Sequence, residues 1–267
     1  QRVYRQYDAS SINDIPVEVF YKELARYQPL VNNAKEAFAD PKTGMAPGVM
    51  GLTAEDMQNF YSQLPKRLES VIWLEQSGKP GYEQAQAIAQ KKFDAVQKPF
   101  TYSFGVSSDA MDYQTLLSLL LTLLCAVIAA PVFASDAQTG AQDIQLCTKN
   151  GGLRLAAAKL AAAFSITGAA YLLCGVVWIL VTTALFGWES TQTSVQWLFS
   201  VTSLLPYTVG QLEWVMLVAN FLIFFAEVAF VLMASVWAKN NLTALSVALI
   251  SVVAPLIVYM VVPGSFG

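Results

Sequence analysis

The chain has 267 residues, of which 55% are hydrophobic, with a mean hydropathy of +0.46 and a formal net charge of −3. This charge, without any basic stripe interleaved with aromatic residues, argues against a nucleic-acid partner. Because histidine and a GxxxxGK[ST] phosphate-binding loop are both absent, we expect no enzyme active site, metal site or cofactor in this chain.

The first 112 residues carry most of the charged side chains and are expected to form a water-soluble domain. This domain is predicted to be mostly helical. Apolar residues recur at helical spacing over Val17–Ala39, and a further helix is expected over Pro80–Val96. Between them, Thr53 followed by two acidic residues is typical of a helix N-cap. We therefore divide the chain into residues 1–112 and a transmembrane domain at 113–267.

Four apolar segments of the second domain are long enough to cross a hydrocarbon core, which takes roughly 20 helical residues. They lie at about 114–134, 155–186, 214–238 and 242–262. Since no water satisfies backbone groups inside a membrane, segments this long must be helices. The predicted fold class is an all-α membrane protein with four transmembrane helices, in contact with membrane lipids, plus a mostly helical extracytoplasmic domain.

The orientation follows from the basic residues. After residue 112 these are only Lys149, Arg154, Lys159 and Lys239, and three of them lie in or just after a polar segment at 135–153. Because short loops rich in Lys and Arg stay in the cytoplasm, we assign this segment to the cytoplasm. One span separates this cytoplasmic segment from residues 1–112, so these residues are predicted to be extracytoplasmic.

The connection between the second and third spans has no basic residue and is assigned to the outer side. Within it, the segment 195–212 begins with an apolar run that is too short to span. We predict a re-entrant or interfacial half-helix there. Four aromatic residues of the connection are expected to form an interfacial belt: Trp188, Trp197, Tyr207 and Trp214.

The cytoplasmic segment has the pattern of a short amphipathic helix. If 135–148 is helical, Phe133 and Ile144 share an apolar face while Asp136 and Asp143 lie on another. Such a helix would lie along the inner membrane face and end at Gly151-Gly152. A helix over Leu153–Phe186 would then be about 50 Å long, so its first turns would protrude from the bilayer. An ordinary loop with orienting charges is the alternative.

One ionisable residue lies near the centre of a span. An ionised Glu227 would cost about 2.5–3.5 kcal/mol on insertion scales, so it should face the bundle interior or a polar cavity. Asn220, seven residues earlier, extends a polar stripe. Glu227 is interpreted either as a substrate, ion or proton contact or as a neutral carboxyl bonded to a neighbouring helix.

The polar segment resembles a motif of the permease subunits of ATP-binding-cassette transporters of the six-helix exporter type. Those permeases have the pattern F-x-x-[DE]-x-x-x-G-x-x-x-[IL] after their second span, followed by a Ser or Thr, a basic residue and a Lys. The matching positions are Phe133, Asp136, Gly140, Ile144, Thr148, Arg154 and Lys159. The family's usual Gly-Thr is Gly140-Ala141 here.

The resemblance implies that segment 135–153 couples the membrane helices to a cytoplasmic ATPase subunit, which would carry the ATP and Mg. The implied coupling residues are Phe133, Asp136, Gly140, Asp143, Ile144, Arg154 and Lys159. From their place within a span, Glu227 and Asn220 are expected to line the transport pathway. The resemblance also implies a second permease subunit, a bacterial plasma membrane, and one further span before Gln1 and another after Gly267.

Two other functions remain open from the residues. In the first, the chain is a membrane-anchored sensor or assembly subunit whose extracytoplasmic domain binds a ligand or partner. In the second, it is an ion-coupled secondary transporter, which rests on Glu227 alone because inverted repeats and broken helices are not evident.

Overall fold

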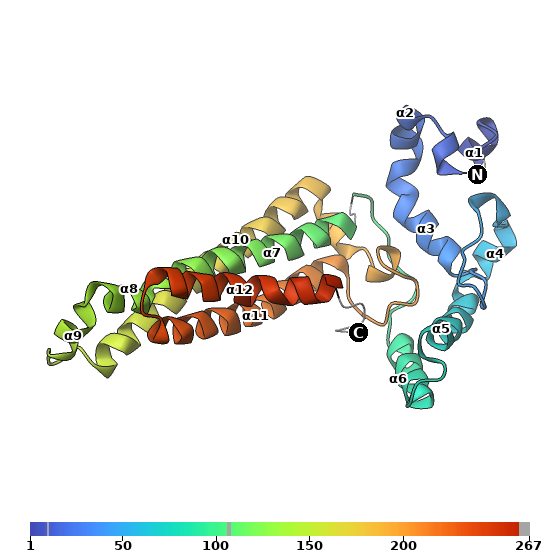
Figure 1. The fold of residues 1–267 in the computed structure, drawn as a ribbon. Helices are drawn as coiled ribbons and strands as arrows, with labels where there is room; N and C mark the ends of the chain where they lie inside the picture. Colours follow the sequence, from blue (N-terminus) through green and yellow to red (C-terminus); the bar gives the residue numbers. More distant parts are fainter. Residues whose placement is uncertain (10, 106–107, 262–267) are drawn as a thin grey trace. The chain divides into compact units, whose positions relative to one another are not determined.

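The computed structural model describes residues 1–9, 11–105 and 108–261, which form helices and connecting segments without a strand (Figure 1). The chain divides into two compact units. The N-terminal unit combines Gln1–Ala110 with Thr182–Glu213, and the membrane unit combines Met111–Val181 with the chain from Trp214 onward. The sequence-based boundary at 112 is therefore close, but the connection between the second and third spans belongs to the first unit.

The N-terminal unit is built from six α-helices in the described residues. They are α1 (Arg2–Gln6), α2 (Val17–Val19), α3 (Gln28–Glu36), α4 (Ala54–Gln58), α5 (Phe60–Gln76) and α6 (Tyr82–Asp94). Between α2 and α3 the helix continues through a π-turn and a 3₁₀-turn, in agreement with the helical pattern over Val17–Ala39. The helix predicted to open at Thr53 is divided at Asn59 into α4 and α5, and α5 forms an antiparallel hairpin with α6 (Figure 1).

The start of α4 has the predicted N-cap. The Thr53 hydroxyl accepts a hydrogen bond from the backbone N–H of Asp56 at 3.1 Å, and the Asp56 carboxylate accepts one from the backbone N–H of Thr53 at 2.8 Å. This reciprocal capping box satisfies two donors that helix geometry leaves free. The hydrogen bonds from the Thr53 backbone and then its hydroxyl lower the pKa of Asp56.

Trp197 lies in the core of the N-terminal unit and not in an interfacial belt. It is 7% exposed, stacks on Phe60 with ring centroids 5.3 Å apart, and meets Phe100 edge to face. The half-helix predicted within 195–212 is also wrong: its apolar run contains only a 3₁₀-turn over Val195–Trp197, and Ser194 pairs with Thr208 in an isolated bridge. This segment is apolar because it packs against the helices before α7.

Polar bonds attach the same segment to α3. The side-chain amide of Asn33 donates to the Trp197 carbonyl at 2.7 Å. The Glu36 carboxylate accepts from the Ser200 hydroxyl at 2.6 Å and from the Val201 backbone N–H at 3.1 Å. Residues more than 160 positions apart in the chain therefore form one core.

The membrane unit contains six helices in its described part: α7 (Ser108–Ala129), α8 (Pro131–Thr139), α9 (Ala141–Leu146), α10 (Leu153–Phe186), α11 (Val209–Trp237) and α12 (Asn241–Val261). Four stretches are long and apolar enough to cross a membrane, Ala110–Thr139, Leu153–Phe186, Val209–Trp237 and Asn241–Val258. They confirm the four predicted spans and a multi-pass membrane protein. The expected end of the last span, at 262, lies outside the described residues.

Small residues let the spanning helices approach closely. The buried core of this unit includes Ala126 and Ala130 on α7 and its end, and Ala244 and Ala248 on α12. Gly175 on α10 meets α11 so closely that a Cβ there would lie 2.3 Å from the Leu217 side chain. Such contacts replace the hydrophobic driving force that helices lack inside lipid.

Candidate functional site

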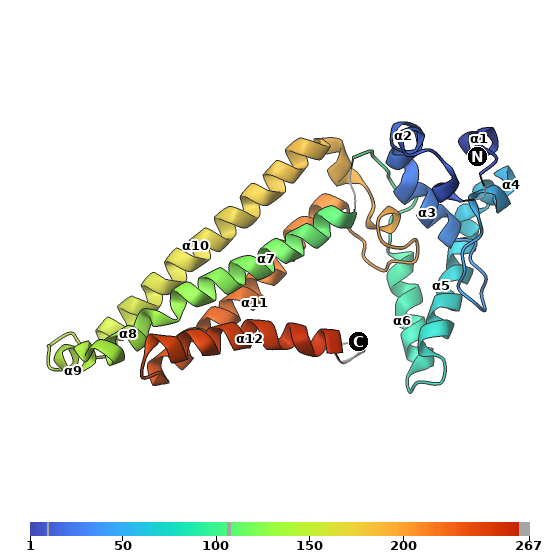
Figure 2. The ribbon, with the colours of Figure 1, turned by 45° about the horizontal axis from the view of Figure 1, so that its top comes forward.

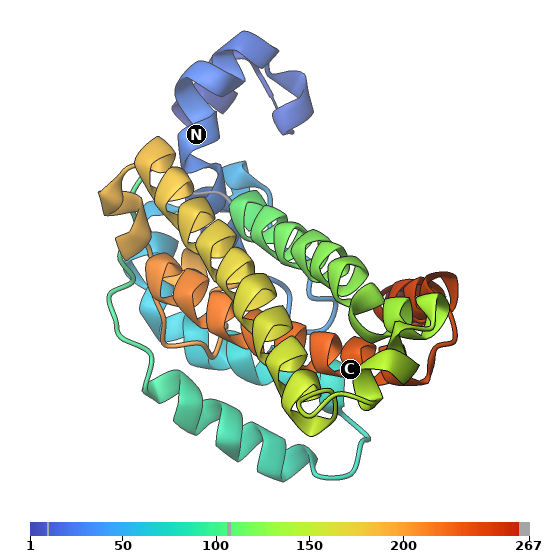
Figure 3. The same ribbon diagram turned by 90° about the vertical axis from the view of Figure 1, so that its left-hand side faces the viewer.

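The candidate site is centred on α8, which continues from the end of α7 (Figure 2). Pro131 begins α8, and its missing N–H interrupts the helical hydrogen bonds at the junction. After α8 the chain turns at Gly140, forms α9 and passes to the start of α10 (Figures 2 and 3). Polar side chains join α8 and this junction to all three of the other spanning helices.

The first of these connections comes from α11. The Ser235 hydroxyl donates to the Ala130 carbonyl at 2.6 Å and accepts from the backbone N–H groups of Phe133 at 3.1 Å and Ala134 at 3.0 Å. A serine hydroxyl offers one donor and two acceptor positions, so all of its hydrogen-bonding capacity is used. Ser235 is fully buried, and it satisfies backbone groups around the proline in a region without water.

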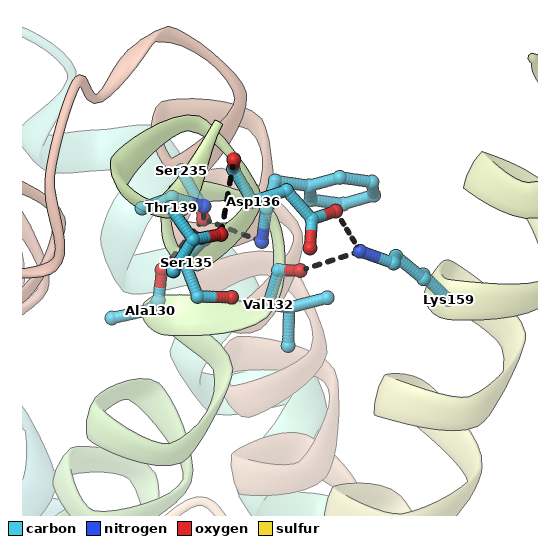
Figure 4. Close-up of polar contacts among 9 residues, drawn as sticks. Ala130, Val132, Ser135, Asp136, Thr139, Lys159 and Ser235 are labelled. Carbon is cyan, nitrogen blue, oxygen red and sulfur yellow. Dashed lines mark hydrogen bonds and ion pairs between the residues drawn. The ribbon is translucent and has the colours of Figure 1, made fainter. Parts of the chain in front are cut away.

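The second connection is an ion pair to α10, shown in Figure 4. The Lys159 ammonium contacts the Asp136 carboxylate and donates to the Val132 carbonyl at 3.3 Å. It also lies 5.6 Å from the centroid of the Phe133 ring. Both charged side chains are only about one-fifth exposed, so the pair is shielded from water far more than a surface salt bridge.

The third connection reaches α12. The Gln138 side-chain carbonyl accepts a hydrogen bond from the backbone N–H of Asn241, the first residue of α12, at 2.9 Å. The Asn240 side chain caps the same helix by accepting from the Thr243 backbone at 2.8 Å. A displacement of α8 would therefore be transmitted directly to α10, α11 and α12.

The turn between α8 and α9 depends on Gly140. This residue has φ of +72°, in the left-handed region that L side chains rarely adopt. Beyond it, α9 presents apolar side chains that the protein leaves uncovered, with Ile144 73% exposed and Leu146 61% exposed. Leu153, at the start of α10, is 90% exposed. Uncovered leucine and isoleucine side chains in α9 and at the very start of α10 are suited to contact with a partner.

A cleft of about 720 Å³ lies between α8, α9, α10 and α11. Asp136 and Lys159 lie on its wall, together with Leu146 and Leu153. The ion pair and the uncovered apolar residues therefore border one concave surface.

The structure divides the predicted coupling residues into two groups. Phe133, Asp136 and Lys159 pack together inside the unit, whereas three others are exposed: Asp143, Ile144 and Arg154. Arg154 is bonded to the Asn150 side chain at 3.1 Å. Gly140 forms the turn between the groups.

The amphipathic helix predicted at 135–148 is wrong, because the segment is not a single helix. Its first part is the end of the helix that begins at α7, and Gly140 breaks it before the second part. By contrast, the helix predicted over Leu153–Phe186 has these bounds in α10.

The two predicted pathway residues line a second cleft, of about 260 Å³, within the membrane unit. Glu227 accepts a hydrogen bond from the Ser251 hydroxyl of α12, and the Asn220 amide donates to the Ser118 hydroxyl of α7 at 3.3 Å. Candidate hydroxyl partners for Glu227 in the sequence, Thr182, Thr183 and Ser246, are not the partner found, which is Ser251. The carboxyl is half-buried and faces this cleft.

Sequence reasoning missed Ser235 and Gln138. Pro131, near the end of the first span, was the available signal for Ser235, because a proline in a membrane helix leaves backbone groups that a neighbouring hydroxyl must satisfy. Gln138 had no comparable signal, since its role depends on how near the start of α12 comes in space.

Comparisons with protein-family models, with curated proteins and with solved structures found no match. The spans define the class, a helical multi-pass membrane protein. The resemblance to a transporter permease stays a prediction that the site has to support.

Proposed function

We propose that the chain is the membrane-spanning permease subunit of an ATP-driven exporter, in which α8 and α9 couple a separate cytoplasmic ATPase to the membrane helices. The observation that carries the proposal is the set of connections of α8 to α10, α11 and α12. A rigid element with such connections can transmit a displacement at one end of the bundle to α10, α11 and α12.

The exposed groups next to α8 support an ATPase contact. Ile144 and Leu153 offer uncovered apolar surface, and Arg154 and Asp143 add charges of both signs around it. An apolar centre with a charged rim is the usual composition of a protein interface. Basic residues at this end of the bundle also favour its assignment to the cytoplasm, with the N-terminal unit outside.

The energy source would be on the other polypeptide. This chain has no phosphate-binding loop, so ATP and Mg would be held by the partner. A second permease subunit, identical or related, would complete the pathway in a bacterial plasma membrane. Glu227 and Asn220 would contact the substrate in the cleft that they line.

The test is affinity purification of the natural full-length protein from its own membrane, followed by identification and assay of associated ATPases. We expect one ATPase subunit to co-purify. Ile144→Asp should weaken its association about tenfold or more, because an exposed apolar contact at the centre of an interface is replaced by a charge.

Met45→Asp is the matched control. Met45 is 75% exposed, close to the 73% of Ile144, but lies in the N-terminal unit, so the ATPase should stay bound. Gly140→Trp should also release the ATPase, since its left-handed backbone disfavours a side chain and the turn into α9 would change. Purification without any nucleotide-binding subunit would contradict the proposal and favour a sensor or assembly subunit.

A further inference from the structure

Hydrogen-bonding side chains from four spanning helices converge on the cleft around Glu227. α7 contributes Thr115, Ser118 and Thr122, α10 contributes Tyr171, α11 contributes Asn220 and Glu227, and α12 contributes Ser251. Tyr171 is only 1% exposed, and its hydroxyl has no hydrogen-bond partner among the described residues. Polar groups are costly inside a membrane, so their concentration at one cleft indicates a binding role.

The cleft has one formal charge and no protein counter-ion among its lining residues. Glu227 is bonded to Ser251, which can donate only one proton. Of the basic residues after 112, Lys159 is paired with Asp136, and neither Lys239 nor any other basic residue lines the cleft. The ligand that would satisfy the carboxylate is therefore a cation.

The remaining walls of the cleft are apolar. They are formed by Leu119, Ile223, Val252, Pro255 and Leu256. A bare metal ion would lose its hydration shell for a single carboxylate, and no group of three or more metal-ligating residues occurs in the described part of the chain. A cation with an apolar body matches both the charge and the walls.

We propose that this cleft binds a small organic cation, such as a quaternary ammonium compound, with the charge near Glu227 and the apolar body against α7 and α12. The inference rests on the proposed function only in naming this ligand as the transported substrate.

The probe is radiolabelled benzyltrimethylammonium, measured by equilibrium binding to the 267-residue chain in nanodiscs of phosphatidylcholine, with empty nanodiscs subtracted. We expect saturable binding that Glu227→Gln weakens roughly ten- to a hundredfold, because the counter-charge is lost in a poorly hydrated cleft. The neutral isostere, in which carbon replaces nitrogen, should compete poorly.

Glu227→Asp keeps the charge and should bind the probe more tightly than Glu227→Gln does. This comparison separates loss of charge from loss of folding. Glu189→Gln removes an exposed carboxylate of the N-terminal unit and should leave binding unchanged. The proposal is overturned by equal binding in Glu227→Gln, by equal competition from the neutral isostere, or by no saturable binding. The binding assay contains no ATPase, so none of these results bears on the proposed ATPase coupling. That coupling is tested separately by co-purification.

Discussion

The core around Trp197 in the N-terminal unit and the connections of α8 in the membrane unit join distant parts of the chain with different side chains. In the N-terminal unit, Phe60, Phe100 and Trp197 bring together segments on either side of two spans. In the membrane unit, a hydroxyl, an amide and an ion pair join α8 to its neighbours. Aromatic burial drives folding in water, whereas inside lipid the spans gain nothing from it and use close packing and hydrogen bonds.

The sharpest test of this comparison is Trp197→Ala. Removing a buried tryptophan should destabilise the N-terminal unit by about 3–5 kcal/mol, through lost burial and a cavity beside Phe60. Amide hydrogen exchange of α5, followed by mass spectrometry, should accelerate strongly. Trp188→Ala is the control, because Trp188 is 72% exposed and should change exchange little. Unaltered protection of α5 in Trp197→Ala would show that the aromatic contacts do not hold this unit together.

The next largest effect is expected from Lys159→Met, which keeps the side-chain stem but leaves the Asp136 carboxylate without its counter-charge. We expect the free energy of unfolding to fall by roughly 2–3 kcal/mol. This is less than for a fully buried ion pair, because both groups keep some exposure. The measurement is thermal unfolding of the detergent-solubilised protein.

The double variant Asp136→Asn with Lys159→Met should recover part of that loss, since no uncompensated charge remains. If the double variant is as unstable as the sum of the single ones, the two residues do not act as a pair.

Ser235→Ala should cost about 1–3 kcal/mol, because buried backbone groups at the proline lose their partner. Thermal unfolding measures the lost stability, and amide hydrogen exchange at Phe133 and Ala134 should become faster. Ser246→Ala is the matched control on α12: its hydroxyl donates only to its own helix, at Leu242, and it is exposed. Equal stabilities of the two variants would remove Ser235 from the set of connections.

The smallest effect concerns α4. Thr53→Ala should destabilise this helix by about 1 kcal/mol through loss of the N-cap. The hydrogen bonds from Thr53 lower the pKa of Asp56 in the folded protein, so their contribution is present above the ordinary carboxyl pKa and is lost as the pH falls through the lowered value. The protection of α4 amides, measured against their intrinsic exchange rate at each pH, should therefore fall below about pH 4 in wild type and respond less in Thr53→Ala. An identical acid response in both would contradict this account.

The membrane spans could be predicted because their signal is local. Hydropathy and the Gly151-Gly152 pair were enough for the start of α10 at Leu153. The resemblance placed Phe133, Asp136 and Lys159 in one motif, but it did not foresee that they pack against each other.

The remaining features depend on contacts between distant residues. Trp197 has the composition of an interfacial belt residue, and only its partners in α5 and before α7 reveal a core position. The helical period over 135–148 likewise does not tell whether a helix continues from the preceding span or lies apart from it. Ser251, the partner of Glu227, is one of several hydroxyls that the sequence alone cannot rank.

The core around Trp197 also constrains the order of events during synthesis. The indole N–H of Trp197 donates to the carbonyl of Phe100, a residue made 97 positions earlier. At ordinary elongation rates the ribosome needs roughly 5–20 s to cover that interval. During this time Phe60 and Phe100 lack their contacts with Trp197. The nascent N-terminal unit therefore exposes apolar surface that only a later part of the chain covers.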